Sequence, residues 1–176
     1  MTPRLIGLLA IVSTFFAGRM TAFAHDGSKL GSAAPSNAQI TGRLRHTIEI
    51  GTRGEYFRRL GKPLTILDGR GTGTLTAVIG GRYPTADGLG QIVFFWHNTT
   101  FIGLSSNYET VAVVSLKSPT PGTFIIKYAQ YRPKDPVCCP SLPPRAVTYR
   151  WSGHILISNG VPPKGIGKPP RVTYKP

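Results

Sequence analysis

The segment that decides the fold is residues 91–104, which reads Gln91-Ile92-Val93-Phe94-Phe95-Trp96-His97-Asn98-Thr99-Thr100-Phe101-Ile102-Gly103-Leu104. Two runs of aromatic and β-branched residues flank a short polar stretch, a spacing typical of a β-hairpin. Asn98 suits the turn because asparagine tolerates positive φ. Residues 92–96 are apolar without alternation, so we expect a central strand with both faces buried, and the segment before the sheet is the candidate cover.

Strand signals continue on both sides of this hairpin. The expected strands are rich in β-branched residues or alternate in polarity, and they cover residues 64–67, 74–79, 111–116, 123–131, 146–151 and 154–157. Turn signals separate them, among them Asp68-Gly69 and Gly80-Gly81. With no long helical period present, the sequence predicts a mainly β (or α+β) fold, a small antiparallel β-rich domain.

The segment before the strands is ambiguous. Ile40, Leu44 and Ile48 recur at helical spacing, whereas residues 47–50 alternate like a strand. We expect a short helical or irregular N-terminal arm over residues 40–60.

The first 24 residues have the pattern of a secretory signal peptide. Arg4 supplies the positive charge, an apolar run follows, and Ala22-Phe23-Ala24 is a small-x-small cleavage site. The run is too short for a stable membrane anchor, and no later segment has the length and apolarity of a membrane span. The sequence thus predicts a signal peptide (1–24), a flexible lead-in (25–39), a single β-rich domain (40–158) and a basic Pro-rich tail (159–176) that does not order itself.

The charge of the chain narrows the range of partners. The chain holds 21 Lys and Arg against 7 Asp and Glu, and the expected mature form keeps a net charge of +12. An exported protein does not ordinarily meet nucleic acid, so the expected counter-charges are anionic envelope polymers or lipid headgroups. A solvated basic surface without a specific ligand is the alternative. We expect no nucleic-acid partner and no integral membrane span, and no particular protein partner is indicated.

The only two cysteines, Cys138 and Cys139, are adjacent in sequence and lie between Pro136 and Pro140. In an oxidising compartment they are candidates for a vicinal disulfide that locks a turn, for free buried thiols, or for a redox or cross-chain role. No Cys-x-x-Cys motif supports a thioredoxin-like chemistry.

Several of these segments together resemble a known family. The segments are 91–97, 101–103, 128–141 with its Asp135-Pro136-Val137-Cys138-Cys139-Pro140-Ser141 run, and 147–151. In their order and spacing over residues 64–157 they resemble the LppP/LprE family of bacterial envelope lipoproteins. The resemblance implies an exported, extracytoplasmic domain and carries over no catalytic residue. No cysteine follows the apolar run, so a lipid-modified N-terminus is not expected, and the expected location is periplasmic or secreted.

Other polar residues suggest two binding sites. Arg132, Lys134, Arg145 and Arg150 fall near several tyrosines and tryptophans and are candidate contacts for an acidic or carbohydrate ligand. Cleavage after Ala24 would make His25 the first residue, whose amine and imidazole can chelate copper together with a second histidine. A solvated N-terminus is the alternative. We expect no cofactor.

The serines, acids and glycines of the chain lack the spacing of a catalytic site. The sequence therefore predicts a non-enzymatic, exported cell-envelope protein that binds, or associates structurally with, anionic envelope components. The alternative is a periplasmic metal- or redox-active protein that uses His25 or the Cys138–Cys139 pair.

Overall fold

The computed structural model describes residues 33–49, 54–85, 90–165 and 172–174. In these ranges one helix and ten strands follow each other: α1 (Asn37–Arg45), β1 (Thr47–Glu49), β2 (Tyr56–Leu67), β3 (Thr74–Tyr83), β4 (Gln91–His97), β5 (Thr100–Leu104), β6 (Val113–Lys117), β7 (Thr123–Gln130), β8 (Leu142–Trp151), β9 (Leu156–Ser158) and β10 (Val172–Tyr174). The expected signal peptide lies outside the described residues.

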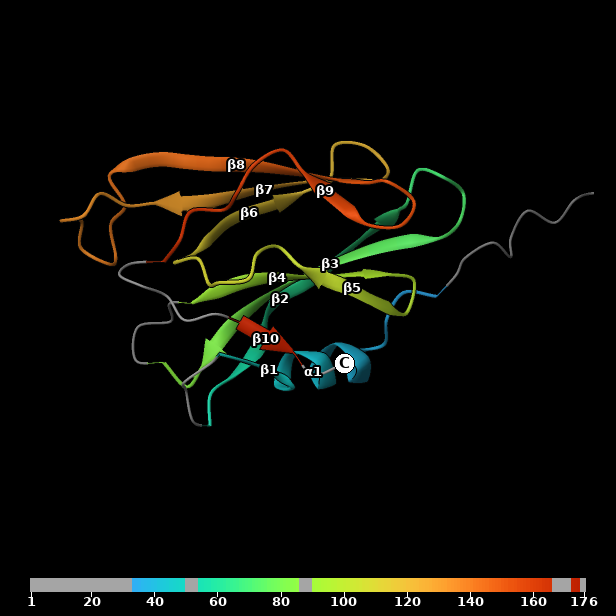
Figure 1. Ribbon diagram of the computed structural model, residues 1–176, viewed down its shortest axis with the longest axis horizontal. Helices are drawn as coiled ribbons and strands as arrows, with labels where there is room; N and C mark the ends of the chain where they lie inside the picture. Colours follow the sequence, from blue (N-terminus) through green and yellow to red (C-terminus); the bar gives the residue numbers. More distant parts are fainter. Residues whose placement is uncertain (1–32, 50–53, 86–89, 166–171, 175–176) are drawn as a thin grey trace, which may run out of the picture.

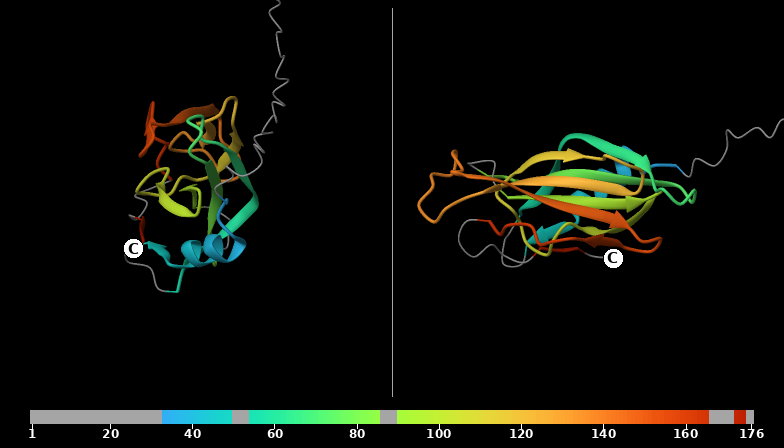
Figure 2. Two further views of the ribbon diagram at one scale, coloured as in Figure 1. Left: turned by 90° about the vertical axis from the view of Figure 1, so that its right-hand side faces the viewer. Right: turned by 90° about the horizontal axis from the view of Figure 1, so that it is seen from above.

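The strands form two four-stranded antiparallel sheets and a small third one. The orders are β2-β3-β4-β5, β6-β7-β8-β9 and β1-β10. Figure 1 shows the sheet β6–β9 at the top, the sheet β2–β5 below it, and α1 with β1 and β10 as a third layer at the bottom. The left view of Figure 2 shows the same layering from the end. The prediction of a small, antiparallel β-rich fold is confirmed.

The first core fills the space between the two large sheets. Alternate residues of each strand point into it, including Ala77 of β3, Phe95 of β4, Phe124 of β7 and Val147 of β8, all of them buried. The buried hydroxyls of Tyr128 and Tyr149 lie 3.1 Å apart, and Tyr149 donates onward to the carbonyl of Ser105. Burial raises the pKa of both phenols, so the pair stays neutral and hydrogen-bonded inside the core.

The second core lies on the other face of the sheet β2–β5. Val78, Phe94 and Trp96 point toward the third layer, where Ile40 and Leu44 of α1 meet them. Strand β4 is therefore buried on both faces, as its unbroken apolar run predicts. The expectation that the N-terminal segment covers this strand is also confirmed.

Local sequence explains why α1 begins where it does. The Ser36 side chain accepts from the backbone N–H of Gln39, and the Gln39 side chain accepts from the N–H of Ser36, which forms a reciprocal capping box. Ile40 and Leu44 are one turn apart, so both face the sheet. Strand β1 follows the helix directly. The helical spacing of Ile40 and Leu44 therefore describes α1, and the alternation over residues 47–50 describes β1.

Three strands extend beyond the ranges expected from the sequence. Strand β2 begins at Tyr56, inside the expected arm, and β3 continues through Gly80 and Gly81 to Tyr83. Glycine is needed within β3 because a Cβ on Gly80 would lie 2.5 Å from the ring of Phe94. Strand β8 begins at Leu142 and includes two exposed prolines beside a register shift, a place where a missing N–H is tolerated.

The expectation of a free C-terminal tail is wrong for the described residues. Val172 is buried in the second core, and β10 pairs antiparallel with β1. Upstream, Gly165 donates to the carbonyl of Glu109 at 3.0 Å, and Tyr108 donates to the carbonyl of Pro162 at 3.1 Å. An apolar residue in a Lys- and Pro-rich stretch thus adds buried area to the second core, and pairing with β1 holds the strand beside it.

In the part of the chain that the structure describes, no helix is long and apolar enough to span a membrane.

Candidate functional site

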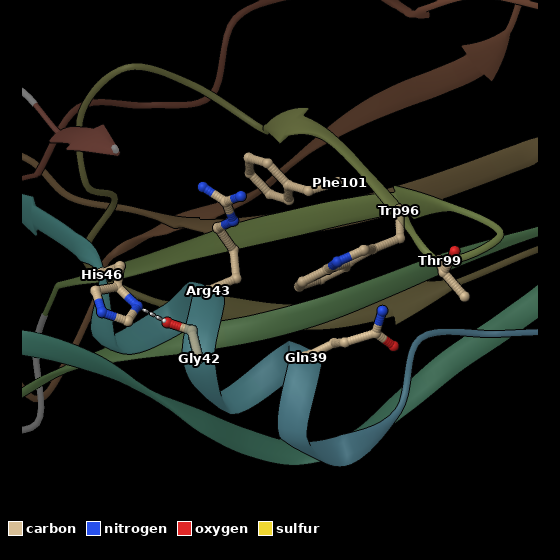
Figure 3. Close-up of a pocket in the computed structure, with 7 residues that line it drawn as sticks. All are labelled: Gln39, Gly42, Arg43, His46, Trp96, Thr99 and Phe101. Carbon is tan, nitrogen blue, oxygen red and sulfur yellow. Dashed lines mark hydrogen bonds between the residues drawn. The ribbon is translucent and has the colours of Figure 1, made fainter. Parts of the chain in front are cut away.

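A groove between α1 and the β4–β5 hairpin is the candidate functional site. The hollow measures about 530 Å³ and is lined by Gln39, Gly42, Arg43, His46, Trp96, Thr99 and Phe101. Figure 3 shows α1 on one side of it and the hairpin on the other. Residues 39, 42, 43 and 46 are three, four and seven positions apart, so they share the helix face next to the one buried by Ile40 and Leu44.

Aromatic rings form the apolar part of this groove. Trp96 is buried and meets Phe101 edge-on at a centroid distance of 5.4 Å. The guanidinium carbon of Arg43 lies 4.7 Å from the centre of the Phe101 ring. Figure 3 shows the Arg43 side chain next to this ring. A cation held over an aromatic face keeps its position and presents its positive charge to a ligand.

The polar side chains of the groove supply donors of different kinds. His46 contacts the carbonyl of Gly42 through Nδ1 at 2.8 Å, and because a carbonyl can only accept, Nδ1 must carry the proton. Gln39 and Thr99 lie toward the other end of the groove in Figure 3. Arginine, amide, hydroxyl and imidazole groups beside aromatic rings make up a surface suited to an acidic or sugar-like ligand.

A row of arginines and tyrosines runs from α1 onto β2 and β3, at the other edge of the sheet from the groove. Arg45 lies 5.8 Å from the Tyr56 ring centre, and Tyr56 lies 5.4 Å from Tyr83, measured between ring centres. Arg58 completes the row at 4.6 Å from the Tyr83 ring centre. No Asp or Glu occurs in the strands β2–β5, and the acids that pair with Arg82 of β3 are Glu55 at 3.4 Å and the buried Glu109 at 3.2 Å.

The structure does not bring the four predicted anionic-ligand contacts into one groove. Arg132 and Lys134 are exposed in the loop between β7 and β8, where Arg132 lines a hollow of about 360 Å³. Arg145 and Arg150 are exposed on β8 and differ by an odd number of positions, so their side chains leave opposite faces of the strand. Sequence proximity to tyrosines therefore did not indicate a shared site.

None of the residues that line the groove was predicted as a binding residue from the sequence. A signal was present, since Gln39, Arg43 and His46 recur at helical spacing. The hairpin side of the groove comes from a distant part of the chain.

The two cysteines lie in the exposed loop between β7 and β8, and the structure joins them by a disulfide bond. Asp135 organises this loop: one carboxylate oxygen accepts from the N–H of Arg132 at 2.7 Å and from the N–H of Ser141 at 2.9 Å. Tyr131 donates to the carbonyl of Val137 at 3.0 Å. These backbone hydrogen bonds lower the pKa of Asp135, so the carboxylate that holds the loop ends together stays ionised.

The histidines do not converge on a metal site in the described ranges. His25 lies outside them, and within them no three His, Cys, Asp or Glu side chains gather closely enough to hold a metal ion. His46 lines the groove, His154 is exposed in the β8–β9 turn, and His97 has a partner in Asp68 at 3.1 Å.

Asp68 and His97 form a structural junction between the two sheets. Burial opposes ionisation of Asp68, but hydrogen bonds from the Thr72 side chain, from the N–H groups of Arg70 and Thr72, and from His97 outweigh it and lower the pKa to about 2. The His97 ring stacks on Trp151 of the opposite sheet at 4.7 Å. Asp68 thus orients an imidazole that packs between β4 and β8.

Comparisons with known proteins give one positive finding. Searches of curated proteins and of solved structures found no significant match to the chain. A family model described as LppP/LprE lipoprotein matches residues 70–154, the part of the chain that holds β3 to β8. Over residues 70–154, the chain is therefore similar to the LppP/LprE lipoprotein family.

Proposed function

We propose that the protein is an exported, non-enzymatic cell-envelope protein that binds an anionic envelope component in the groove between α1 and the β4–β5 hairpin. The observation that carries the proposal is the position of Arg43, whose guanidinium is held over Phe101 at the edge of an aromatic-lined groove. Arg43 and Arg45 lie in the last turn of α1, which contains no acidic residue, and would concentrate anions near the groove. Similarity to a lipoprotein family over residues 70–154 supports an envelope role.

Calorimetric titration with two soluble probes tests the proposal. Oligogalacturonate presents carboxylates on a saccharide, and glycerol phosphate presents the charge of a lipid headgroup. We expect binding of at least one probe that weakens as salt rises, because exposed charges are screened over about 8–10 Å at moderate ionic strength. Arg43→Gln should weaken that binding about tenfold, the effect of losing one charge-assisted hydrogen bond.

Arg145→Gln is the matched control. It removes the same charge from an exposed residue of β8, away from the groove, and should leave the affinity within about twofold because a distant exposed charge is largely screened. Equal losses in both variants would show that the protein responds to total charge only. No binding of either probe by the parent protein would refute the groove as an anion site.

The exposed disulfide favours a second candidate function. Both cysteines are solvent-exposed, so a dithiol reductant can reach them. Two electrons and two protons from that dithiol would open the bond to two thiols, and the dithiol would become a disulfide. If the protein acts through this exchange, it should oxidise one equivalent of a dithiol, and Cys138→Ser with Cys139→Ser should abolish that oxidation and leave probe binding in the groove unchanged.

A further inference from the structure

The outer face of the sheet β6–β9 is a second surface with the character of a binding site. Among the described residues no layer covers it, whereas the sheet β2–β5 is covered on both faces (Figures 1 and 2). Ile126 and Val147 point into the first core, so their neighbours Lys127 and Thr148 point outward. This face lies on the opposite side of the molecule from the groove.

The strand register brings three cations together on this outer face. Lys117 is opposite Ile125, while Lys127 is opposite Ser115, so the two lysines are diagonal neighbours about 7–8 Å apart. Arg150 is opposite Thr123 on one side and Ile157 on the other, which places it one strand further along the same face. All three side chains are exposed.

Among the described residues of this sheet, no carboxylate offsets these cations. The strands β6, β7, β8 and β9 contain no Asp or Glu. The nearest described acids along the chain are engaged elsewhere: Asp135 binds backbone N–H groups within its own loop, and Glu109 is buried 3.2 Å from Arg82. The face therefore presents an uncompensated positive field to solvent.

Large apolar side chains accompany the cations. Ile157 on β9 is 57% exposed, and Ile155 in the preceding turn is 62% exposed. Ile157 and Arg150 are cross-strand partners and both line a shallow hollow of about 450 Å³. Val114, on the opposite edge strand β6, is 54% exposed.

We propose that this face docks onto the headgroup layer of a bilayer that contains anionic lipids. A membrane surface offers negative charge above an apolar interior, so lysine and arginine heads can reach phosphates while isoleucines leave water. A soluble polyanion would satisfy the cations but would leave Ile155 and Ile157 in water. The combination of charge and exposed apolar area thus favours the bilayer.

Vesicle sedimentation of the full-length mature protein, purified after export, tests this docking surface. Vesicles of phosphatidylglycerol and phosphatidylcholine in equal parts should bind the protein, and vesicles of phosphatidylcholine alone should not. Lys117→Gln, Lys127→Gln and Arg150→Gln combined should weaken binding on the order of 100-fold, at roughly fivefold per cation near an anionic surface. Ile155→Ser with Ile157→Ser should weaken it by about tenfold through lost apolar burial.

The control triple, Lys62→Gln, Arg132→Gln and Lys134→Gln, removes the same charge from exposed residues outside this face and should bind vesicles like the parent. Equal losses in the two triples would overturn the docking surface in favour of overall charge. Undiminished vesicle binding by the isoleucine variant, together with full competition by dextran sulfate, would mean that the face binds soluble polyanions. Arg43→Gln should not change vesicle binding. The groove proposal is tested by titration with the soluble probes and the docking proposal by vesicle sedimentation, so the failure of one can be told from the failure of the other.

Discussion

At the scale of the residue, Asp68 shows how one carboxylate can join several loops. One of its oxygens accepts from the N–H of Arg70 at 2.9 Å, and the other is shared by Thr72 and His97. The neighbouring backbone is equally constrained: a Cβ on Gly122 would lie 2.6 Å from the carbonyl oxygen of Asp68. The β2–β3 loop, which holds the Asp68 carboxylate, and the β6–β7 loop, which holds Gly122, are therefore in close backbone contact.

The lowered pKa of Asp68 predicts an acid-sensitive contribution to stability. The folded pKa is about 2 and the ordinary value is 3.8, so the contribution is present above about pH 4 and is lost as the pH falls toward 2. A shift of this size corresponds to about 2 kcal/mol. Asp68→Asn should therefore lower the free energy of unfolding by about 2 kcal/mol near neutral pH, measured by urea denaturation. The difference from the parent should shrink below about pH 4; a difference that is constant with pH would contradict this assignment.

The two cysteines carry a separate prediction at the same scale. If Cys138 and Cys139 are joined as the structure shows, a thiol reagent should add nothing to the unreduced protein, even when it is denatured. After reduction, two labels should appear in the mass spectrum. Two labels without reduction would demonstrate free thiols, and a dimer that is lost on reduction would demonstrate cross-chain pairing.

At the scale of the element, β10 changes the expected role of the C-terminal segment. Val172 is 7% exposed and packs among the residues that hold α1 on the sheet. Val172→Ala should lower the free energy of unfolding by about 1–2 kcal/mol, since it removes two buried methyl-sized groups. Thermal or urea denaturation measures the loss. Val161→Ala removes the same atoms from a side chain that is 58% exposed and should have almost no effect; equal losses would mean that burial is not the cause.

The sequence predicted those elements whose signals are local. The β4–β5 hairpin follows from its apolar runs and from Asn98, which adopts a φ of 55°. The first residues of β2 were not predicted as strand because apolar and polar residues do not alternate over Tyr56–Leu60, where Arg58 and Arg59 are adjacent. Hydrogen-bonded pairing with β3 holds these residues in an extended conformation. The strand β10 and the groove depend on contacts between distant segments, and no local pattern encodes those contacts.

At the scale of the whole molecule, the sheet β2–β5 belongs to both hydrophobic cores. Trp96 reports on the core beneath α1, and Trp151 reports on the core between the large sheets. Because both cores share β3 and β4, we expect them to unfold together. Single-tryptophan variants, Trp96→Phe and Trp151→Phe, should give coincident urea transitions followed by fluorescence. Transitions with separate midpoints would show that the α1 layer unfolds independently.

The pairing of β1 with β10 has a consequence for the order in which the molecule can be completed. A ribosome releases Ile40 and Leu44 more than a hundred residues before Val172. Until the last strand emerges, the underside of the nascent sheet lacks its final cover, and closing it requires a very long-range contact of the kind that slows folding. A chain built in this way cannot complete the cover of its second core before β10 has been synthesised.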